Sequence, residues 1–275
     1  MTRVNEVALL LEQPQGLNEN FDVSLRKMIS AASELGAEVI FGKRERISNT
    51  ITFSKSLDPA IPLVAYGSIQ FIRNLSVPHF AYGWSGTDWA NVASRIPRNW
   101  LLNDDYVMTS WGDLESNFDW WSDKLDSTGL FIRPNSDKKV FAGQTFRRDN
   151  ASIEMPAIRN LTSVMPETIC VASSIKYDFT EYRFFIVNRK IVGMSPYSAQ
   201  NKNSIIPSAA IDFVNLLCQL DWQPDSCYVI DVAVLADNTA RLIEYNSMCC
   251  SGVYDCEVVP IIQAVLDQSI RDSYL

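Results

Sequence analysis

The sequence predicts an α/β N-terminal part followed by an α+β region, and three features predict it. The first is a strand–helix–strand pattern over residues 6–41, which is typical of a βαβ unit with parallel strands. The second is a pair of hairpins at about residues 181–195 and 227–245, whose strands pair antiparallel. The third is a set of amphipathic helices around these hairpins. A chain of 275 residues suits two domains, or one domain with an attached lobe.

The N-terminal elements follow from hydrophobic periodicity. A helix over residues 22–35 places its apolar side chains on one face, and Gly36 is a typical stop signal. No Gly-x-Gly-x-x-Gly motif follows the first strand, so the unit lacks a dinucleotide-binding fingerprint. The expected elements are a strand at residues 6–11, this helix, a strand at 38–41, a strand at 63–65 and a short helix at 68–75.

Composition and charge exclude several classes of protein. The net charge of −8 argues against nucleic-acid binding, which needs a basic stripe. The longest apolar runs are short strands, so we expect no membrane span, and the N-terminus lacks the apolar core of a signal peptide. We therefore expect a cytoplasmic protein whose six cysteines are reduced. His79 is the single histidine and no Cys-x-x-Cys pair is present, which argues against a structural zinc site.

The middle of the chain is rich in aromatic residues. Tryptophan and tyrosine residues crowd residues 79–123, where they either line a substrate pocket or fill a seam between lobes, and we favour the seam. Asp113 is expected to cap a helix over residues 114–125. We expect the domain boundary near Asn103, which gives a first domain of residues 1–103 and a second of residues 104–275.

The C-terminal half alternates strands and helices. Residues 130–134 form one expected strand, and residues 169–172 form another that the serines at 173 and 174 should break. The first hairpin turns at residues 188–190. Helices are expected at residues 207–220 and 260–270.

The second hairpin concentrates hard oxygen ligands. Its strands, at residues 227–235 and 240–245, are joined by Asp237-Asn238, which is turn chemistry. Asp231 lies in an apolar run, where a carboxylate is costly to bury unless it pairs or binds a cation. Glu244 and Asn246 are two apart and share a face. These three side chains suit Mg²⁺ or Mn²⁺. The alternative, which geometry leaves equally open, is a satisfied polar network at a strand end.

Two stretches carry a resemblance to a known family. Asp231-Val232-Ala233, a turn, and then residues 242–246 (LIEYN) resemble the metal-binding end of the ATP-grasp superfamily. Residues 251–255 (SGVYD) resemble its R-two-K clade of bacterial and phage proteins. The resemblance implies that Asp231, Glu244 and Asn246 hold the magnesium of MgATP. It implies a pre-ATP-grasp α/β domain followed by a two-lobed ATP-grasp fold, with a central lobe at about 104–168 and a C-terminal lobe at about 169–275. Strands from residues 169–195 and 227–245 would then share the C-terminal lobe.

The same resemblance assigns a nucleotide site. Residues 131–143 resemble the segment whose arginine and lysine, here Arg133 and Lys139, meet the phosphates, although on spacing alone both are solvated loop cations. Arg183 is implied to be a phosphate or transition-state contact that Glu181 orients, where the alternative is a surface ion pair. Lys139 and Arg183 are the implied catalytic residues. The main chain of Val171, Ala172 and Ser173 is implied to bind adenine.

The activity that this resemblance implies is ATP-dependent ligation of a carboxylate to an amine through an acyl phosphate. The sequence does not identify the two substrates or the oligomeric state. The alternatives are a non-catalytic nucleotide-binding module and an interaction protein that docks a partner through its aromatic residues. On the metal interpretation, Glu244→Gln should abolish Mg²⁺-dependent nucleotide binding and leave thermal stability unchanged or raised, because repulsion between clustered carboxylates is removed.

Overall fold

The computed structural model describes residues 6–14, 19–45, 47–136, 138–197 and 205–274. Its contacts divide the chain into two compact units. Unit 1 comprises Met1–Gly86, Glu181–Val232 and Tyr245–Leu275, and unit 2 comprises Thr87–Thr180 and Ala233–Glu244. The predicted domain boundary near Asn103 cuts the chain once, whereas each of these units combines several segments. That boundary stays a prediction.

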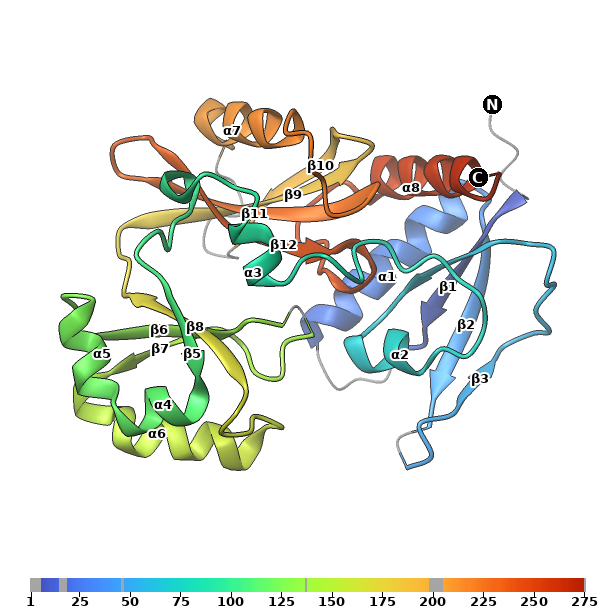
Figure 1. Ribbon diagram of the computed structural model, residues 1–275. Coiled ribbons are helices and arrows are strands. Elements are labelled where there is room, and N and C mark those ends of the chain that lie inside the picture. Colours follow the sequence, from blue (N-terminus) through green and yellow to red (C-terminus); the bar gives the residue numbers. More distant parts are fainter. Residues whose placement is uncertain (1–5, 15–18, 46, 137, 198–204, 275) are drawn as a thin grey trace. The chain divides into compact units, whose positions relative to one another are not determined.

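Unit 1 begins with a mainly parallel four-stranded sheet of order β3-β2-β1-β4 (Figure 1). Strand β1 pairs in parallel with both β2 and β4, which confirms the βαβ unit expected from the sequence. The short strand β3 is antiparallel to β2 and was not predicted. The elements are β1 (Ala8–Glu12), α1 (Glu19–Glu34), β2 (Glu38–Arg44), β3 (Ile51–Phe53), β4 (Leu63–Tyr66) and α2 (Ile69–Asn74).

A second four-stranded sheet has the order β10-β9-β11-β12 and contains both predicted hairpins. Their turns need left-handed backbone, and Asn188, Arg189 and Asn238 adopt it, with φ of 47°, 63° and 64°. The elements are β9 (Phe179–Val187), β10 (Lys190–Pro196), α7 (Ser208–Cys218), β11 (Cys227–Leu235), β12 (Ala240–Ser247), the 3-10 helix η4 (Met248–Cys250) and α8 (Val258–Asp272).

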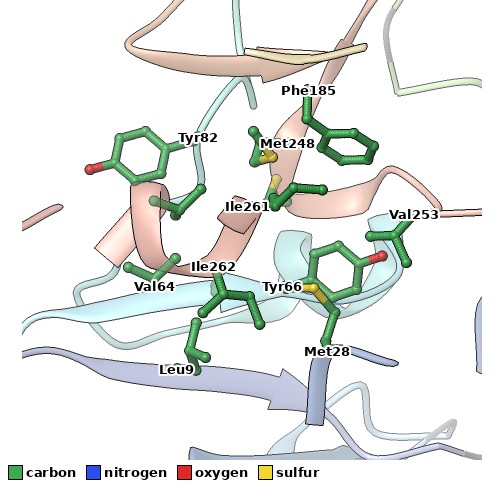
Figure 2. A pocket seen from close by; sticks show the side chains of 13 residues that line it. Leu9, Met28, Val64, Tyr66, Tyr82, Phe185, Met248, Val253, Ile261 and Ile262 are labelled. Atoms are coloured by element: carbon green, nitrogen blue, oxygen red, sulfur yellow. The ribbon is translucent and has the colours of Figure 1, made fainter. Parts of the chain in front are cut away.

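The core of unit 1 lies where helices α1 and α8 cover apolar side chains of both sheets. It encloses a cavity of about 20 Å³, shown in Figure 2. The hydroxyl groups of Tyr66 and Tyr82, whose rings line this cavity, bond elsewhere, to the carbonyl of Ser251 and to the carboxylate of Asp272. An apolar space of this size holds about one water molecule and offers it no partner. We therefore interpret it as a packing gap and not as a ligand pocket.

Unit 2 contains an antiparallel sheet of order β5-β8-β6-β7, with α4, α5 and α6 on one face (Figure 1). Its core is formed by apolar residues of these strands and helices around the fully buried Trp111. The elements are α3 (Trp89–Ala93), the 3-10 helix η2 (Arg98–Trp100), β5 (Val107–Ser110), α4 (Trp111–Ser116), α5 (Phe118–Lys124), β6 (Gly129–Pro134), β7 (Gln144–Arg147), α6 (Arg148–Leu161) and β8 (Ile169–Ser174).

Strand β8 corrects one sequence expectation. It pairs with β5 and β6, in a different sheet from the two C-terminal hairpins, while the predicted lobe bounds stay a prediction. It also runs through Ser173 and Ser174, which pair with Phe131 and Leu130 of β6, and is not broken there. The reason is that the hydrogen bonds between strands use main-chain N–H and C=O groups. Serine supplies both groups, as does every residue except proline, which lacks the N–H.

The helix expected at residues 114–125 is two helices, and its predicted cap is wrong. The Ser110 hydroxyl accepts a hydrogen bond from the Asp113 main-chain N–H and caps α4, and α5 begins after Asn117. The Asp113 carboxylate instead accepts hydrogen bonds from Thr109, Asn117 and Trp121, which lower its pKa. From the first turn of α4, Asp113 therefore links α4 to α5 through its hydrogen bond with Trp121.

Tyr245 on β12 carries a buried hydroxyl without a hydrogen-bond partner in the described part of the chain. Replacing Tyr245 by phenylalanine should therefore leave the free energy of unfolding unchanged or raise it by about 1 kcal/mol, because an unmade hydrogen bond costs desolvation. Tyr228 is the matched control, since its hydroxyl bonds Gln223 and Tyr228→Phe should destabilise. Urea unfolding measures both. A larger loss for Tyr245→Phe than for Tyr228→Phe would contradict this.

Within the described ranges, none of the helices combines the length and the apolar character that a bilayer-spanning segment requires.

Candidate functional site

The first candidate cluster, in unit 1, is built on the buried ion pair between Arg183 and Asp231, which lie on neighbouring strands β9 and β11. Arg183 Nε donates to Asp231 Oδ1 at 2.8 Å and Nη2 donates to Oδ2 at 2.7 Å. Asn246 Nδ2 also donates to Oδ2, at 2.8 Å. Asp231 is 0% exposed and Arg183 is 4% exposed. We call these three residues the Arg183 cluster.

Its electrostatics follow from burial. A buried carboxylate is costly unless it is paired and hydrogen-bonded, and the planar guanidinium fork supplies both. Burial alone lowers the pKa of Arg183, but the Asp231 carboxylate outweighs burial and raises that pKa well above its ordinary value. Arg183 is therefore a permanent cation held in one orientation.

Two tyrosine rings cover one side of the Arg183 guanidinium. Its Cζ atom lies 4.8 Å from the Tyr197 ring centroid and 4.9 Å from that of Tyr254. The two centroids are themselves 4.8 Å apart. Rings on opposite faces would lie about twice as far apart, so both lie on the same side. Such contacts favour the charged guanidinium.

Arg183 keeps donors for an anion. Its Nη1 donates to the Gly252 carbonyl at 3.2 Å, and the Asp231 bonds use Nε and one Nη2 hydrogen. A guanidinium has five N–H donors. Among contacts of the described residues, two donors therefore remain, which is the number that a phosphate or carboxylate accepts in a bidentate contact.

The segment Ser251–Asp255 is held against Arg183 by helix α1. Ser24 Oγ accepts a hydrogen bond from the Val253 N–H at 3.1 Å, and Lys27 Nζ bonds the Tyr254 carbonyl and lies 3.6 Å from Asp255. Tyr254 has a φ of 42°, in the left-handed region that a bulky residue rarely adopts. These contacts maintain a strained backbone next to a charged side chain, which is common at functional sites.

The second candidate cluster, in unit 2, is centred on Glu244, which faces two cations. Arg133 Nη2 lies 2.7 Å from Glu244 Oε2, and Lys139 Nζ lies 3.0 Å from Oε1. The side chains of Arg133, Glu244 and Lys139 are 7%, 13% and 36% exposed. The Arg133 Cζ atom also lies 5.3 Å from the Trp89 ring centroid. We call Arg133, Lys139 and Glu244 the Glu244 cluster.

Gly143 packs closely against the end of strand β6, next to Arg133. A side chain at Gly143 would bring a Cβ to 2.9 Å from the Phe131 ring and 3.2 Å from Arg133 Cβ. The strand end and the following loop therefore pack together only because residue 143 is glycine. This contact holds the stem of Arg133 in place.

The structure groups the sequence-predicted site residues differently from the expected trio of oxygen ligands. Asp231 and Asn246 meet Arg183 in unit 1, whereas Glu244 meets Arg133 and Lys139 in unit 2. Among the described residues, no three histidine, cysteine, aspartate or glutamate side chains form a metal-sized group. Each carboxylate is matched by cations. The expectation that Glu244→Gln relieves carboxylate repulsion is therefore revised, because the mutation removes attraction as well.

The donor set nevertheless suits magnesium chemically. Two carboxylates and an amide supply only oxygen ligands, which Mg²⁺ prefers. Asn246 bonds Asp231 through its nitrogen, so that bond does not use its oxygen. Glu244 becomes available to a divalent cation if Arg133 and Lys139 turn to another anion, such as a phosphate.

The predicted adenine-binding residues lie on the central strand β8. Val171 pairs with Met108 and Arg133, and Ala172 pairs with Val107 and Ile132, so both have neighbours on both sides. The β5 ladder ends at Val107–Ala172, and Ser173 pairs on the β6 side. Of the three residues, Ser173 is therefore the one at an open end of the sheet.

The orienting partner of Arg183 was not foreseen. The sequence suggested Glu181, whose main-chain carbonyl accepts a hydrogen bond from the Tyr197 N–H, whereas Asp231 makes the bidentate contact. Tyr254, Gly252 and Trp89 were also missed as contacts of Arg183 and Arg133. A signal for the ion pair was present, since a lone acid in an apolar strand requires a partner and Arg183 lies in a run equally apolar.

Comparisons with known proteins identify a family and a set of solved structures with the same fold. The family model that matches residues 111–264 describes an ATP-grasp domain of the R-two-K clade, family 2. No curated protein sequence is significantly similar to the chain. Solved structures with the same fold include the D-cycloserine synthetase DcsG, at 12% identity, a TM-score of 0.60 and coverage of 95% of this chain and 100% of that one.

Two further structures extend the comparison. The D-alanine–D-alanine ligase from Bacillus anthracis matches at 13% identity and a TM-score of 0.59, with 98% of each chain covered. The macrocyclase MdnC, bound with precursor peptide MdnA, from Microcystis aeruginosa MRC matches at 13% identity and a TM-score of 0.56, covering 97% of this chain and 100% of that one. At such identities these structures show the fold.

Proposed function

The chain belongs to the R-two-K clade of the ATP-grasp superfamily, and on this premise we propose that it is an ATP-dependent ligase that joins a carboxylate to an amine. The observation that carries the proposal is the Arg183 cluster. A permanent cation is fixed in orientation by Asp231 and, among contacts of the described residues, retains two donors for an anion. A chain that only bound nucleotide would need charge balance but not a preorganised guanidinium of this kind.

The proposed reaction has two steps. The substrate carboxylate oxygen attacks the γ-phosphorus of ATP, the bond to the β-phosphate oxygen breaks, and ADP leaves. The amine nitrogen then attacks the acyl carbon, inorganic phosphate leaves, and the amine gives up a proton. Arg183 would meet the negative charge that develops during phosphoryl transfer, and its fixed orientation avoids reorganisation at that moment.

The Glu244 cluster would supply phosphate cations. Arg133 and Lys139 neutralise Glu244 in this structure and would turn to the phosphates when a divalent cation neutralises Glu244 instead. Asp231, Glu244 and Asn246 would hold that cation, magnesium or manganese, whose chemistry is to neutralise phosphate charge. Ser173 would bind adenine through its main chain, Val171 and Ala172 would support that strand, and Glu181 would assist Arg183.

The structural neighbours suggest which substrates to try. They include ligases for D-alanine, a D-cycloserine synthetase and a macrocyclase bound with its precursor peptide. We therefore propose that the carboxylate belongs to an amino acid or to a peptide. A non-catalytic nucleotide-binding module remains the second candidate, favoured by no specific observation in the structure.

Hydroxylamine trapping tests the ligase. With ATP, Mg²⁺ and a panel of amino acids and peptides, the active carboxylate should yield a hydroxamate and an equal amount of ADP, because hydroxylamine captures the acyl phosphate. Coupled ADP detection and a colorimetric hydroxamate assay measure the two products. Formation of AMP and pyrophosphate would contradict the mechanism, and tight ATP binding without turnover across the panel would favour the non-catalytic module.

A further inference from the structure

Cys249 and Cys250 are adjacent in η4, in the segment between Asn246 and Gly252, and their Sγ atoms lie 3.8 Å apart. All six cysteines of the chain lie in described residues, and Cys250 is the half-exposed one while the others are buried. Burial raises the pKa of Cys170 and Cys256 to about 12 and also raises the pKa of Cys218 and Cys227. Those four thiols stay protonated and react slowly.

We propose that Cys249 and Cys250 form a reversible oxidation site, in which a disulfide between adjacent residues displaces the segment that anchors Arg183. The oxidant is a peroxide. The Cys250 sulfur attacks one peroxide oxygen, which gives a sulfenic acid and releases water. The Cys249 sulfur then attacks the sulfenyl sulfur, the S–S bond forms, and a second water leaves. Two thiols thus supply the two electrons that reduce the peroxide, and an external dithiol reverses the change.

A disulfide between adjacent residues cannot form without a change in the backbone. Adjacent Cα atoms lie about 3.8 Å apart across a trans peptide, below the usual range of about 4.4–6.8 Å for disulfides. The Sγ atoms must close from 3.8 Å to about 2.05 Å. Because the peptide fixes the Cα–Cα distance, the sulfur atoms can bond only if the backbone dihedral angles of the turn change together with the side-chain rotamers. Strained disulfides of this kind are readily reduced, which suits a reversible site.

The contacts of the segment determine which part moves. Cys249 is held on both sides of its main chain, since its carbonyl accepts from the Gly67 N–H at 2.9 Å and its N–H donates to the Tyr82 carbonyl at 3.3 Å. Upstream, Gly83 packs so closely that an added Cβ would lie 2.9 Å from Ser247 Cα. Motion at residues 247–249 is therefore blocked, and Cys250 is the residue that must move.

The displacement is then passed downstream. The Ser251 carbonyl accepts from the Tyr66 hydroxyl at 2.7 Å, and the Gly252 carbonyl accepts from Arg183 Nη1 at 3.2 Å. Moving Cys250 pulls on both carbonyls. The contact between Gly252 and Arg183 should lengthen or break, which loosens Arg183 on that side. Oxidation would thus weaken the contact between Arg183 and Gly252 and leave the ion pair between Arg183 and Asp231 in place.

Hydrogen peroxide treatment of the whole protein tests the site. The tryptic peptide that contains both cysteines should lose the mass of two hydrogen atoms and regain it with dithiothreitol. Cys250→Ser should show no such loss, and Cys256→Ser, which removes a buried cysteine outside the pair, should behave like the wild type. Free thiols at both positions after treatment, or oxidation of one sulfur to a sulfinic acid, would overturn the proposal.

The effect on Arg183 rests on the proposed function, whereas the oxidation does not, so two further readouts keep them apart. The oxidised wild type should melt at a lower temperature than the reduced protein, and hydroxamate formation should fall and recover with dithiothreitol. Cys250→Ser should show neither change. A disulfide with an unaltered melting temperature would overturn the coupling to the Ser251–Gly252 segment. If the reduced protein forms no hydroxamate, the ligase proposal fails while the mass and melting results still decide the oxidation site.

Discussion

Replacing Arg183 by methionine is expected to lower the free energy of unfolding by about 3–5 kcal/mol, because it leaves the Asp231 carboxylate buried without its cation. Asp231→Asn should also destabilise, since it leaves the guanidinium buried without its anion. The double variant should lose much less than the sum of the two, because both charges are then absent. Urea unfolding of the wild type, the two single variants and the double variant measures this coupling.

The control is an exposed ion pair of the same chemistry. Arg159 and Glu115 lie 3.0 Å apart on the surface of unit 2, with side chains 43% and 18% exposed. Arg159→Met should cost no more than about 1 kcal/mol. Equal losses for Arg183→Met and Arg159→Met, or strictly additive losses at residues 183 and 231, would show that the buried pair contributes little. Because Arg183→Met disturbs folding, Arg183→Lys is the better variant for activity, and it should suppress hydroxamate formation while preserving a cation.

Changing Glu244 to glutamine is expected to weaken Mg²⁺-dependent ATP binding at least about 10-fold. Replacing a group that merely supports a metal ligand already costs about 10–100-fold, and a ligand itself should cost at least as much. Isothermal titration with ATP, with and without Mg²⁺, measures the effect. Binding of MgATP by the variant at wild-type strength would exclude Glu244 as a ligand.

The same variant has a predicted effect on stability. Glutamine keeps an oxygen for Arg133 or Lys139 but removes the charge that both cations face. We expect a loss of about 1.5–3 kcal/mol, the value typical of hydrogen bonds to charged groups. Glu115→Gln is the matched control, since it also faces an arginine but should leave ATP binding unchanged. Higher stability of Glu244→Gln would restore the view that carboxylate repulsion dominates there.

The local elements followed from residues close together in the chain. The turn at Asn188 and Arg189 and the one at Asn238 were predictable, because hairpins select residues that tolerate left-handed backbone. The alternation along β12 placed Glu244 and Asn246 on one face of that strand. The motif at residues 242–246 therefore identified the family before any long-range contact was considered, and the match at residues 111–264 confirmed the family.

Only the tertiary structure decided which partner each charged group and each strand has. Strand β8 carries apolar residues that suit either sheet, so its pairing with β5 and β6 depends on residues far earlier in the chain, from Val107 opposite Ala172 to Pro134 opposite Cys170. Asp231 and Glu244 read alike as metal ligands in the sequence, yet the fold gives Arg183 to the first and Arg133 with Lys139 to the second. A carboxylate in a strand attracts any cation that the neighbouring strands bring within reach. Which cation that is depends on strand order and register, and these are settled by packing of the whole core and not by local spacing.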